Sequence, residues 1–448
     1  MIKTSKTALI AALLAGAAGF VAAQPAVAKN KQQQPAAGQQ AQPQLKLSAD
    51  FRKVAAPAQQ ALNSGDLATA ATGITAAEAA AKTDDEKYIA EQLRLSLTAK
   101  QAQAAGRNNA VGDTTLAAPL DALIANPVTP RDQLGKYAYL RGTIAFEQKK
   151  YADALGYFQK AEAAGYQDPD MALQIAKAKV ESGDTAGGVA EIDKVIKADE
   201  AAGQKAPEDL YRYAIAKLYK TNDRAATLDW VRRWLTAYPT AKNWRDAIYV
   251  FGFEGPTAAQ LGKAQKIDLY RLMAVTNSLA DQGDYLQYAQ YALDLGLPDE
   301  AKTVLAKGKA NGKLGSGGAA ASLGSLAQKQ IASEGSLASL ATKAKASSTG
   351  DLATQTADAY LGQDNYAEAI QLYQLGLQKG VKDANLVNLH LGIAEALSGD
   401  KAAAAAQFAK VQPGPDKDVA TLWQTWVSTG TGPSAGAAAA SPASPPAG

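Results

Sequence analysis

The chain repeats itself at intervals of about 34 residues, and this constrains its fold more than any other feature. Each interval holds enough sequence for a helix, a tight turn and a second helix. One helical hairpin cannot cover its own apolar face, so repeated hairpins must stack on one another. The small residues that mark the series are Ala70, Ala154, Gly188, Thr227, Ala301, Gly335, Ala369 and Ala404, with a spacing of 34 from Ala154 to Gly188, from Ala301 to Gly335 and from Gly335 to Ala369.

Turn motifs support the same organisation. In each, Gly takes the left-handed conformation that ends one helix. The following Asp caps the next helix by accepting hydrogen bonds from its free N–H groups. The four motifs are Ser64-Gly65-Asp66, Ser182-Gly183-Asp184, Gln282-Gly283-Asp284 and Ser398-Gly399-Asp400.

Composition explains how such hairpins would pack. Alanine dominates an apolar fraction of 47%, and aromatic residues make up only 7%. Alanine is the best helix former and a poor core filler. Ala or Gly at a crossing point lets two helices approach closely, and an aromatic residue four positions later fills the space beside them. The sequence therefore predicts an all-α fold, a solenoid of stacked helical hairpins without strands.

These residues resemble the tetratricopeptide repeat family. The resemblance covers roughly residues 48–428, but stretches 80–130 and 241–280 depart from the period and predict longer helices or an insertion. It implies a superhelix with a concave groove that holds peptides or other proteins. The matching positions are Gly142, Tyr151, Ala154, Phe158 and Ala161 in one unit and Leu391, Gly392, Gly399, Ala404 and Phe408 in another.

The N-terminus reads as a secretory signal peptide over residues 1–28. Lys3 and Lys6 precede an apolar run, and a small-residue signature predicts cleavage after Ala28, or alternatively after Ala23. An uncleaved anchor is the other interpretation, although the run is short for a membrane span. We expect a periplasmic protein, secreted through this signal peptide, whose mature chain has no membrane span.

Two segments of low complexity flank the array. Residues 29–47 are rich in Gln, Pro and Ala and predict a flexible linker. Residues 429–448 hold only Gly, Ala, Ser, Thr and Pro, which cannot bury enough surface to become ordered. The tetratricopeptide-like array then spans residues 48–428.

Residue counts exclude whole classes of site. The chain has no Cys and one His, so disulfides, thiolate zinc sites and multi-histidine zinc sites are impossible. A formal net charge of +3 argues against a nucleic-acid binder. His390 has no identifiable nucleophile or orienting acid, which predicts a helix-surface or interface role. The acidic clusters 84–86 and 168–170 are typical of helix starts. We expect no catalytic residue, metal or cofactor.

Aromatic residues concentrate in one stretch. Ten of the chain's thirty lie within residues 211–253, and we expect most to be core, with a minority lining the groove. Trp423 and Trp426 occupy the predicted last helix. They are expected to cover the open apolar face of the final hairpin.

The resemblance also indicates a partner-binding surface, since the first helix of each unit lines the inner face in that family. Cations and aromatics there suit an extended segment bearing acidic or C-terminal carboxylate groups. The alternative is that the aromatics pack against neighbouring helices while the cations stay solvated. The residues concerned are Lys136, Tyr139, Phe146, Arg212, Tyr219 and Lys220.

Three functions remain open at this point. The first is a non-enzymatic periplasmic scaffold for protein or peptide partners in the cell envelope. The second is an enzyme that uses concave-face carboxylates on cell-wall glycans, and the third is a solenoid that binds carbohydrate through exposed aromatics. A converging acid pair in a pocket would favour the enzyme, and no such pair stands out in the sequence.

Overall fold

The computed structural model describes residues 45–106, 114–168 and 170–430. Every regular element in those ranges is a helix and none is a strand, which confirms the all-α prediction of stacked helical hairpins. The chain forms two compact units, residues 1–203 and 204–448. The expected signal peptide 1–28 lies outside the described residues, as do nearly all of the expected linker 29–47 and tail 429–448.

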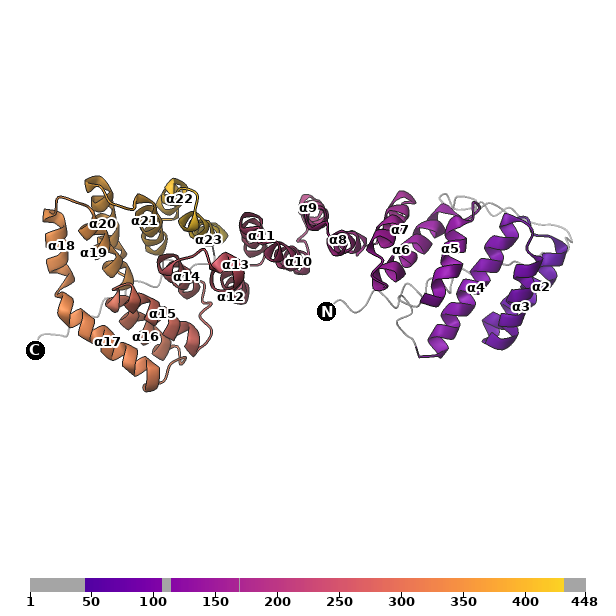
Figure 1. The fold of residues 1–448 in the computed structure, drawn as a ribbon, viewed down its shortest axis with the longest axis horizontal. Coiled ribbons are helices and arrows are strands. Elements are labelled where there is room, and N and C mark those ends of the chain that lie inside the picture. Colours follow the sequence, from indigo (N-terminus) through magenta and orange to yellow (C-terminus); the bar gives the residue numbers. More distant parts are fainter. Residues whose placement is uncertain (1–44, 107–113, 169, 431–448) are drawn as a thin grey trace, which may run out of the picture. The chain divides into compact units, whose positions relative to one another are not determined.

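Unit 1 is a row of antiparallel helix pairs (Figure 1). Helices α2 and α3, α6 and α7, and α8 and α9 form hairpins, and α4 packs on α2, α3 and α5. The helices are α2 (Ala49–Ser64), α3 (Leu67–Ala80), α4 (Asp84–Ala104), η2 (Thr114–Leu116), α5 (Ala117–Ala125), α6 (Arg131–Glu147), α7 (Tyr151–Ala163), α8 (Met171–Glu181) and α9 (Thr185–Ala201).

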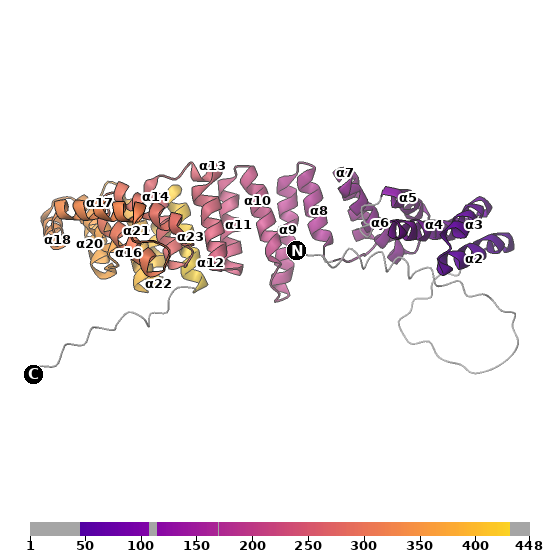
Figure 2. The ribbon, with the colours of Figure 1, turned by 90° about the horizontal axis from the view of Figure 1, so that it is seen from below.

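Unit 2 begins with the hairpin of α10 (Glu208–Lys220) and α11 (Arg224–Ala237), which lie side by side in Figures 1 and 2. Further hairpins are α15 with α16, α19 with α20, and α21 with α22. The remaining helices are α12 (Ala241–Ile248), the π-helical turn η3 (Tyr249–Phe253), α13 (Gly255–Ala258), α14 (Lys263–Val275), α15 (Gln282–Asp294), α16 (Pro298–Ala310), α17 (Gly318–Glu334), α18 (Leu337–Ala346), α19 (Asp351–Gly362), α20 (Tyr366–Lys379), α21 (Ala384–Ser398), α22 (Lys401–Lys410) and α23 (Pro415–Thr429).

The last helix closes unit 2 on itself. Trp423 and Trp426 are buried in α23, which packs on α21 and α22 and also on α11 and α14. The Trp423 indole N–H donates to the Asp268 carbonyl over 3.2 Å, and Arg224 pairs with Asp418. The expected cover for the final hairpin is therefore also a bridge to the start of unit 2.

The small residues of the repeat sit where the hairpins cross. Gly188 is buried, and the six others that fit the series have no exposed surface. A Cβ on Gly142 would lie 2.7 Å from the Phe158 ring, and one on Gly392 would lie 2.6 Å from Phe408. The six fully buried residues are Ala70, Ala154, Thr227, Ala301, Ala369 and Ala404.

One marker of the repeat was wrong. Gly335 is exposed and lies after α17 with φ +84°, so it ends a helix and does not mark a crossing. The cause is the length of α17. Its 17 residues extend beyond the position at which the 34-residue repeat predicts a hairpin turn.

Three of the four turn motifs have the predicted geometry. Gly65, Gly183 and Gly399 have φ of +85°, +101° and +97°, and the Asp after each caps the next helix. The fourth prediction is wrong, because Gln282-Gly283-Asp284 forms the first turn of α15, which Asp281 caps. The turn of that hairpin lies at Gly296 instead.

The two irregular stretches differ in kind. In the first, α4 runs for 21 residues and starts with a capping box between Thr83 and Glu86, as the acidic cluster predicts. The other acidic cluster differs: Asp170 precedes α8, but its side chain does not cap that helix. In the second, α12 ends after eight residues in the π-helical turn η3.

Candidate functional site

Helix α10 carries three of the predicted partner-binding residues. Its apolar side is buried against the rest of the hairpin through Leu210, Ala214 and Leu218. Arg212 and Lys220 are exposed on the helix, and Tyr219 is half-buried. Because Arg212 and Tyr219 are seven residues apart, they lie on the same side of the helix. The sequence thus places two exposed cations beside a tyrosine.

Arg212 is held by groups from the next two helices. Its guanidinium lies 5.6 Å from the centre of the Trp234 ring on α11 and 3.9 Å from the Asp246 carboxylate on α12. The Arg212 side chain keeps 49% of its surface exposed, which leaves guanidinium N–H donors open to a ligand.

A half-buried carboxylate, that of Glu208, joins α10, α11 and α12. Glu208 accepts a hydrogen bond from the Trp234 indole over 3.0 Å and another from the Asn243 amide over 2.8 Å. Each of the three residues belongs to a different helix, α10, α11 or α12. Charge-assisted hydrogen bonds of this kind fix side-chain geometry, so the Trp234 ring over which Arg212 lies is held in place.

Residues 211–253, which include Arg212, are rich in both aromatic and cationic side chains. Of their ten aromatic residues, five are buried and five are half-buried, so half of them are core. Cations stack over several of these rings, as Arg233 does over Trp230 and Arg245 over Tyr249. The buried five are Tyr211, Trp230, Trp234, Trp244 and Phe251.

The other three predicted residues lie on α6, in unit 1. Tyr139 is buried, its ring packs 5.8 Å from Phe158, and its hydroxyl donates to Asp168 over 3.2 Å. Burial and the Asp168 charge raise the pKa of Tyr139. Phe146 is half-buried against Tyr151. Both aromatic side chains therefore pack against a neighbouring helix, as the alternative interpretation expects. Lys136 is half-buried.

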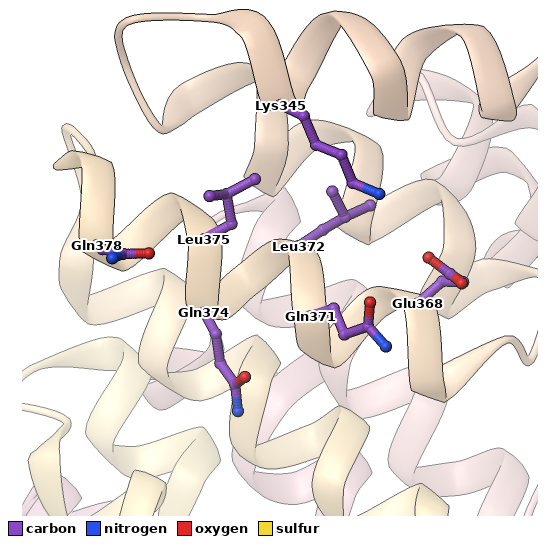
Figure 3. Close-up of a pocket in the computed structure, with 7 residues that line it drawn as sticks. All are labelled: Lys345, Glu368, Gln371, Leu372, Gln374, Leu375 and Gln378. Atoms are coloured by element: carbon purple, nitrogen blue, oxygen red, sulfur yellow. The ribbon is translucent and has the colours of Figure 1, made fainter.

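A shallow cleft of about 440 Å³ lies between α18 and α20 (Figure 3). Lys345 reaches into it from α18, and α20 supplies Leu372 and Leu375 together with Glu368. The polar lining is completed by the amides of Gln371, Gln374 and Gln378. Glutamine amides both donate and accept hydrogen bonds, so such a lining can pair with peptide groups or sugar hydroxyls.

The sole histidine lies in a charged cluster inside unit 2. His390 Nδ1 is 2.7 Å from Asp358 Oδ1, and Nε2 is 3.2 Å from Asp268 Oδ2. Arg271 donates to Asp268 over 2.7 Å and forms two hydrogen bonds with Glu300, over 2.8 and 2.6 Å. Helices α14, α16, α19 and α21 each contribute a charge, which places His390 at a helix interface, as predicted.

The cluster holds its histidine charged. Burial alone would lower the pKa of His390, but the charges of Asp268 and Asp358 outweigh it and raise the pKa to about 10. The pKa of Asp358 is lowered, because His390 offsets the effect of burial. An imidazolium between two carboxylates has no free lone pair with which to act as a base. The cluster therefore acts as an internal ionic lock between helices.

Sequence reasoning missed this lock. Asp268, Arg271 and Glu300 are spread over 33 residues and show no motif. The available signal was the placement of charged residues on the apolar sides of α14 and α16, where an isolated charge would be costly.

Among the described residues there is no group of three or more His, Asp or Glu side chains suited to a metal ion. Likewise, no helix in the described ranges is long and apolar enough to cross a membrane.

No protein-family model matches this chain, and no curated protein matches it in sequence. Solved structures that align with it include the pentatricopeptide repeat protein PPR10 from maize, at 12% identity and a TM-score of 0.29 over 82% of this chain. The APC/C hetero-tetramer Cut9-Hcn1 aligns at 13% identity and 0.18 over 81%, and Naa15/Naa10 bound to HypK-THB at 11% and 0.21 over 82%. The chain spans 55%, 86% and 70% of those three chains, respectively. Because these similarities are so distant, the fold is assigned from the helix packing described above.

Proposed function

We propose that this protein is a non-enzymatic scaffold of the tetratricopeptide-repeat type that holds an extended acidic segment of a partner protein. The observation that carries the proposal is Arg212, a half-exposed cation on α10 that lies over Trp234 of α11 and near Asp246 of α12. Arg binds a carboxylate through two parallel hydrogen bonds, and a positioned guanidinium loses little entropy on binding.

The neighbouring side chains suit the same ligand. Lys220 lies one turn beyond Ala216 on the exposed side of α10, and the small Ala216 leaves room between the two cations. Tyr219 rests its hydroxyl against Gly255, whose φ of +63° and missing side chain make the space. Asp246 competes for Arg212 only weakly at 3.9 Å, so an incoming carboxylate can replace it.

The proposed location follows from the sequence. Residues 1–28 have the charged start, apolar run and small-residue cleavage signature of a signal peptide, and the chain has no Cys that an oxidising compartment could affect. We therefore place the protein in the bacterial periplasm and its partners in the cell envelope. Determining the N-terminal residue of the periplasmic protein tests this directly. A mature N-terminus at Lys29 or Gln24 supports export, and an intact Met1 in the cytoplasm contradicts it.

The binding surface is tested by a double charge reversal, Arg212→Glu with Lys220→Glu. Both side chains are exposed, so the variant should melt within about 2 °C of the wild type. Envelope proteins that co-purify with the wild type should fall by about tenfold or more, because two attractive contacts become repulsive. Their recovery is measured by quantitative mass spectrometry.

A matched control is Lys194→Glu with Lys197→Glu on α9, where both side chains are also exposed. This variant carries the same change in net charge. We expect it to retain the partners. Equal recovery from both variants and the wild type would remove α10 as the binding surface.

Carbohydrate binding is the second candidate, and the amide-lined cleft of α20 is the observation that favours it. Glycans are held through hydrogen bonds to their hydroxyls, which Gln371 and Gln374 can supply. Replacing both by Ala should abolish sedimentation with purified cell-wall material under this alternative. An unchanged variant, or a wild type that stays in solution, excludes it.

A further inference from the structure

Unit 2 carries a basic segment at one edge. Residues 301–346, which span most of α16 together with α17 and α18, hold seven Lys and a single acidic residue, Glu334. They contain no Arg and no aromatic residue. In both views α17 and α18 lie at the outer edge of their unit (Figures 1 and 2). The lysines are Lys302, Lys307, Lys309, Lys313, Lys329, Lys343 and Lys345.

The charge of this segment is available to a partner. All seven Lys residues are exposed. Lys307 pairs with Asp364 over 2.6 Å, whereas the other six have no ion pair with any described residue. With Lys307 paired and Glu334 counted, the segment presents a net charge of about +5. Within a Debye length of roughly 8 Å, such charges add to one another at physiological salt.

An exposed leucine accompanies these charges. Leu326 on α17 is 42% exposed and is the one large apolar side chain that is exposed in the described part of the chain. Lys329 follows it by three residues and so lies on the same side of the helix. Only Ala320 and Ala327 of α17 are buried, which means that most of this helix faces away from the core.

The residue types select among anionic partners. Protein interfaces draw most of their affinity from Trp, Tyr and Arg, and this segment has none of them. Lys is a point charge on a flexible stem, without the planar fork that recognises one defined carboxylate or phosphate. Many Lys around one exposed Leu suit a surface of dense negative headgroups over an apolar layer, where Lys stems extend along the boundary.

We propose that the face formed by α17, α18 and the lysines of α16 binds the surface of a membrane that contains anionic phospholipid. Lys329 and Lys343 contact headgroups there, and Leu326 enters the boundary between headgroups and acyl chains. This binding is reversible, because it depends on screened charges and one apolar side chain. It is separate from the Arg212 surface, so the scaffold can hold a partner while it rests on a membrane.

The experiment is vesicle co-sedimentation of the purified protein. Vesicles contain either phosphatidylcholine alone or phosphatidylcholine with 40% phosphatidylglycerol. All variants are prepared from the same cellular fraction, so that every sample has the same N-terminus. We expect binding to the anionic vesicles that falls steeply as salt rises from about 0.05 to 0.5 M, and little binding to the neutral vesicles.

The main variant is Lys313→Gln with Lys329→Gln and Lys343→Gln. Each Lys near an anionic surface changes binding by about fivefold, so the triple variant should bind on the order of 100-fold more weakly. The control is Lys53→Gln with Lys194→Gln and Lys197→Gln, which removes three exposed charges from α2 and α9. Equal loss in both variants would show a general charge effect and overturn the proposal.

A second variant separates lipid from soluble polyanions. Leu326→Gln should weaken binding to anionic vesicles by about threefold or more, while binding to heparin stays unchanged. If Leu326→Gln has no effect on vesicles and heparin competes fully, the occupant is a polyanion and the lipid proposal fails. Wild-type protein that does not sediment with anionic vesicles at low salt also contradicts it. Either result leaves the Arg212 surface untouched, since that is measured by partner recovery.

Discussion

Two stretches of unit 2 have nearly the same length and opposite compositions. Residues 205–253 form α10, α11, α12 and η3 and contain ten aromatic residues and five Arg. Residues 301–346, in α16, α17 and α18, contain neither type. Both stretches are helical, so the difference does not lie in secondary structure. It lies in what is buried between helices: large rings in the first stretch, and on α17 and α18 of the second only alanines.

This difference sets how firmly each stretch is held. In the first, large buried side chains such as Trp244 and Phe251 pack between helices, and Glu208 ties three helices together. In the second, α17 buries two alanines and α18 buries two more. Because stability from packing scales with buried apolar area, the aromatic stretch is the stronger part of the unit. Binding through Arg212 requires a precisely positioned side chain, whereas binding through the lysines of residues 301–346 requires only exposed charge.

The largest predicted contrast comes from truncating one side chain in each stretch. Trp244 is 1% exposed, so Trp244→Ala should lower the free energy of unfolding by about 3–5 kcal/mol through lost burial and a cavity. Leu326→Ala should change it by less than about 0.5 kcal/mol. Urea denaturation followed by circular dichroism measures both. Similar losses in the two variants would mean that α17 is packed as firmly as α12.

The sequence predicted the first stretch better than the second, and the reason is physical. Aromatic clustering and the 34-residue spacing are local signals, and they located α10 and the buried crossing residues. In the second stretch Gly335 was misplaced, because an Ala-rich helix can extend without leaving a mark in the pattern. For the ionic lock, the sequence places charges on the apolar sides of α14 and α16, but it does not show which residues pair. The pairing depends on helices α14, α16, α19 and α21 meeting in space, which no local pattern records.

The ionic lock lies outside both stretches, and in it Arg271 on α14 holds Glu300 on α16. His390 adds a charge between Asp268 and Asp358, near Arg271 and Tyr373, and its pKa is raised to about 10. A folded pKa above the unfolded value near 6.5 stabilises the folded state fully below pH 6.5. That contribution is lost as the pH rises through 10.

Between pH 6.5 and pH 10, unit 2 should therefore lose on the order of 4 kcal/mol of stability. Urea midpoints at several pH values measure the loss. His390→Gln serves as the comparison, because it should be less stable at pH 7 and should lack this part of the pH dependence. Parallel curves for the wild type and the variant would show that His390 contributes no charge to the lock.

Glycines offer a smaller test within the same comparison. Gly252 lies in η3, where an added Cβ would sit 2.1 Å from Cδ1 of Leu269, a side chain with no exposed surface. Because Leu269 is fully buried, moving its side chain away would disturb the packing around it. Gly252→Ala should therefore cost about 1–3 kcal/mol by overpacking. A thermal melt checks this, and an unchanged melting temperature would mean that the aromatic stretch can yield locally.

The smallest effect has the opposite sign. Gly324 lies inside α17, and a Cβ there would meet only Leu305, at an ordinary contact distance of 3.9 Å. With no clash to offset it, the higher helix propensity of Ala should stabilise α17 by about 0.5–1 kcal/mol. Hydrogen exchange measured by mass spectrometry should show slower exchange across α17 in Gly324→Ala, with α10 to α12 unchanged. If Gly324→Ala instead destabilises the helix as Gly252→Ala does, the second stretch is as tightly packed as the first. The two stretches, which carry the Arg212 surface and the lysine-rich segment, would then no longer differ in packing.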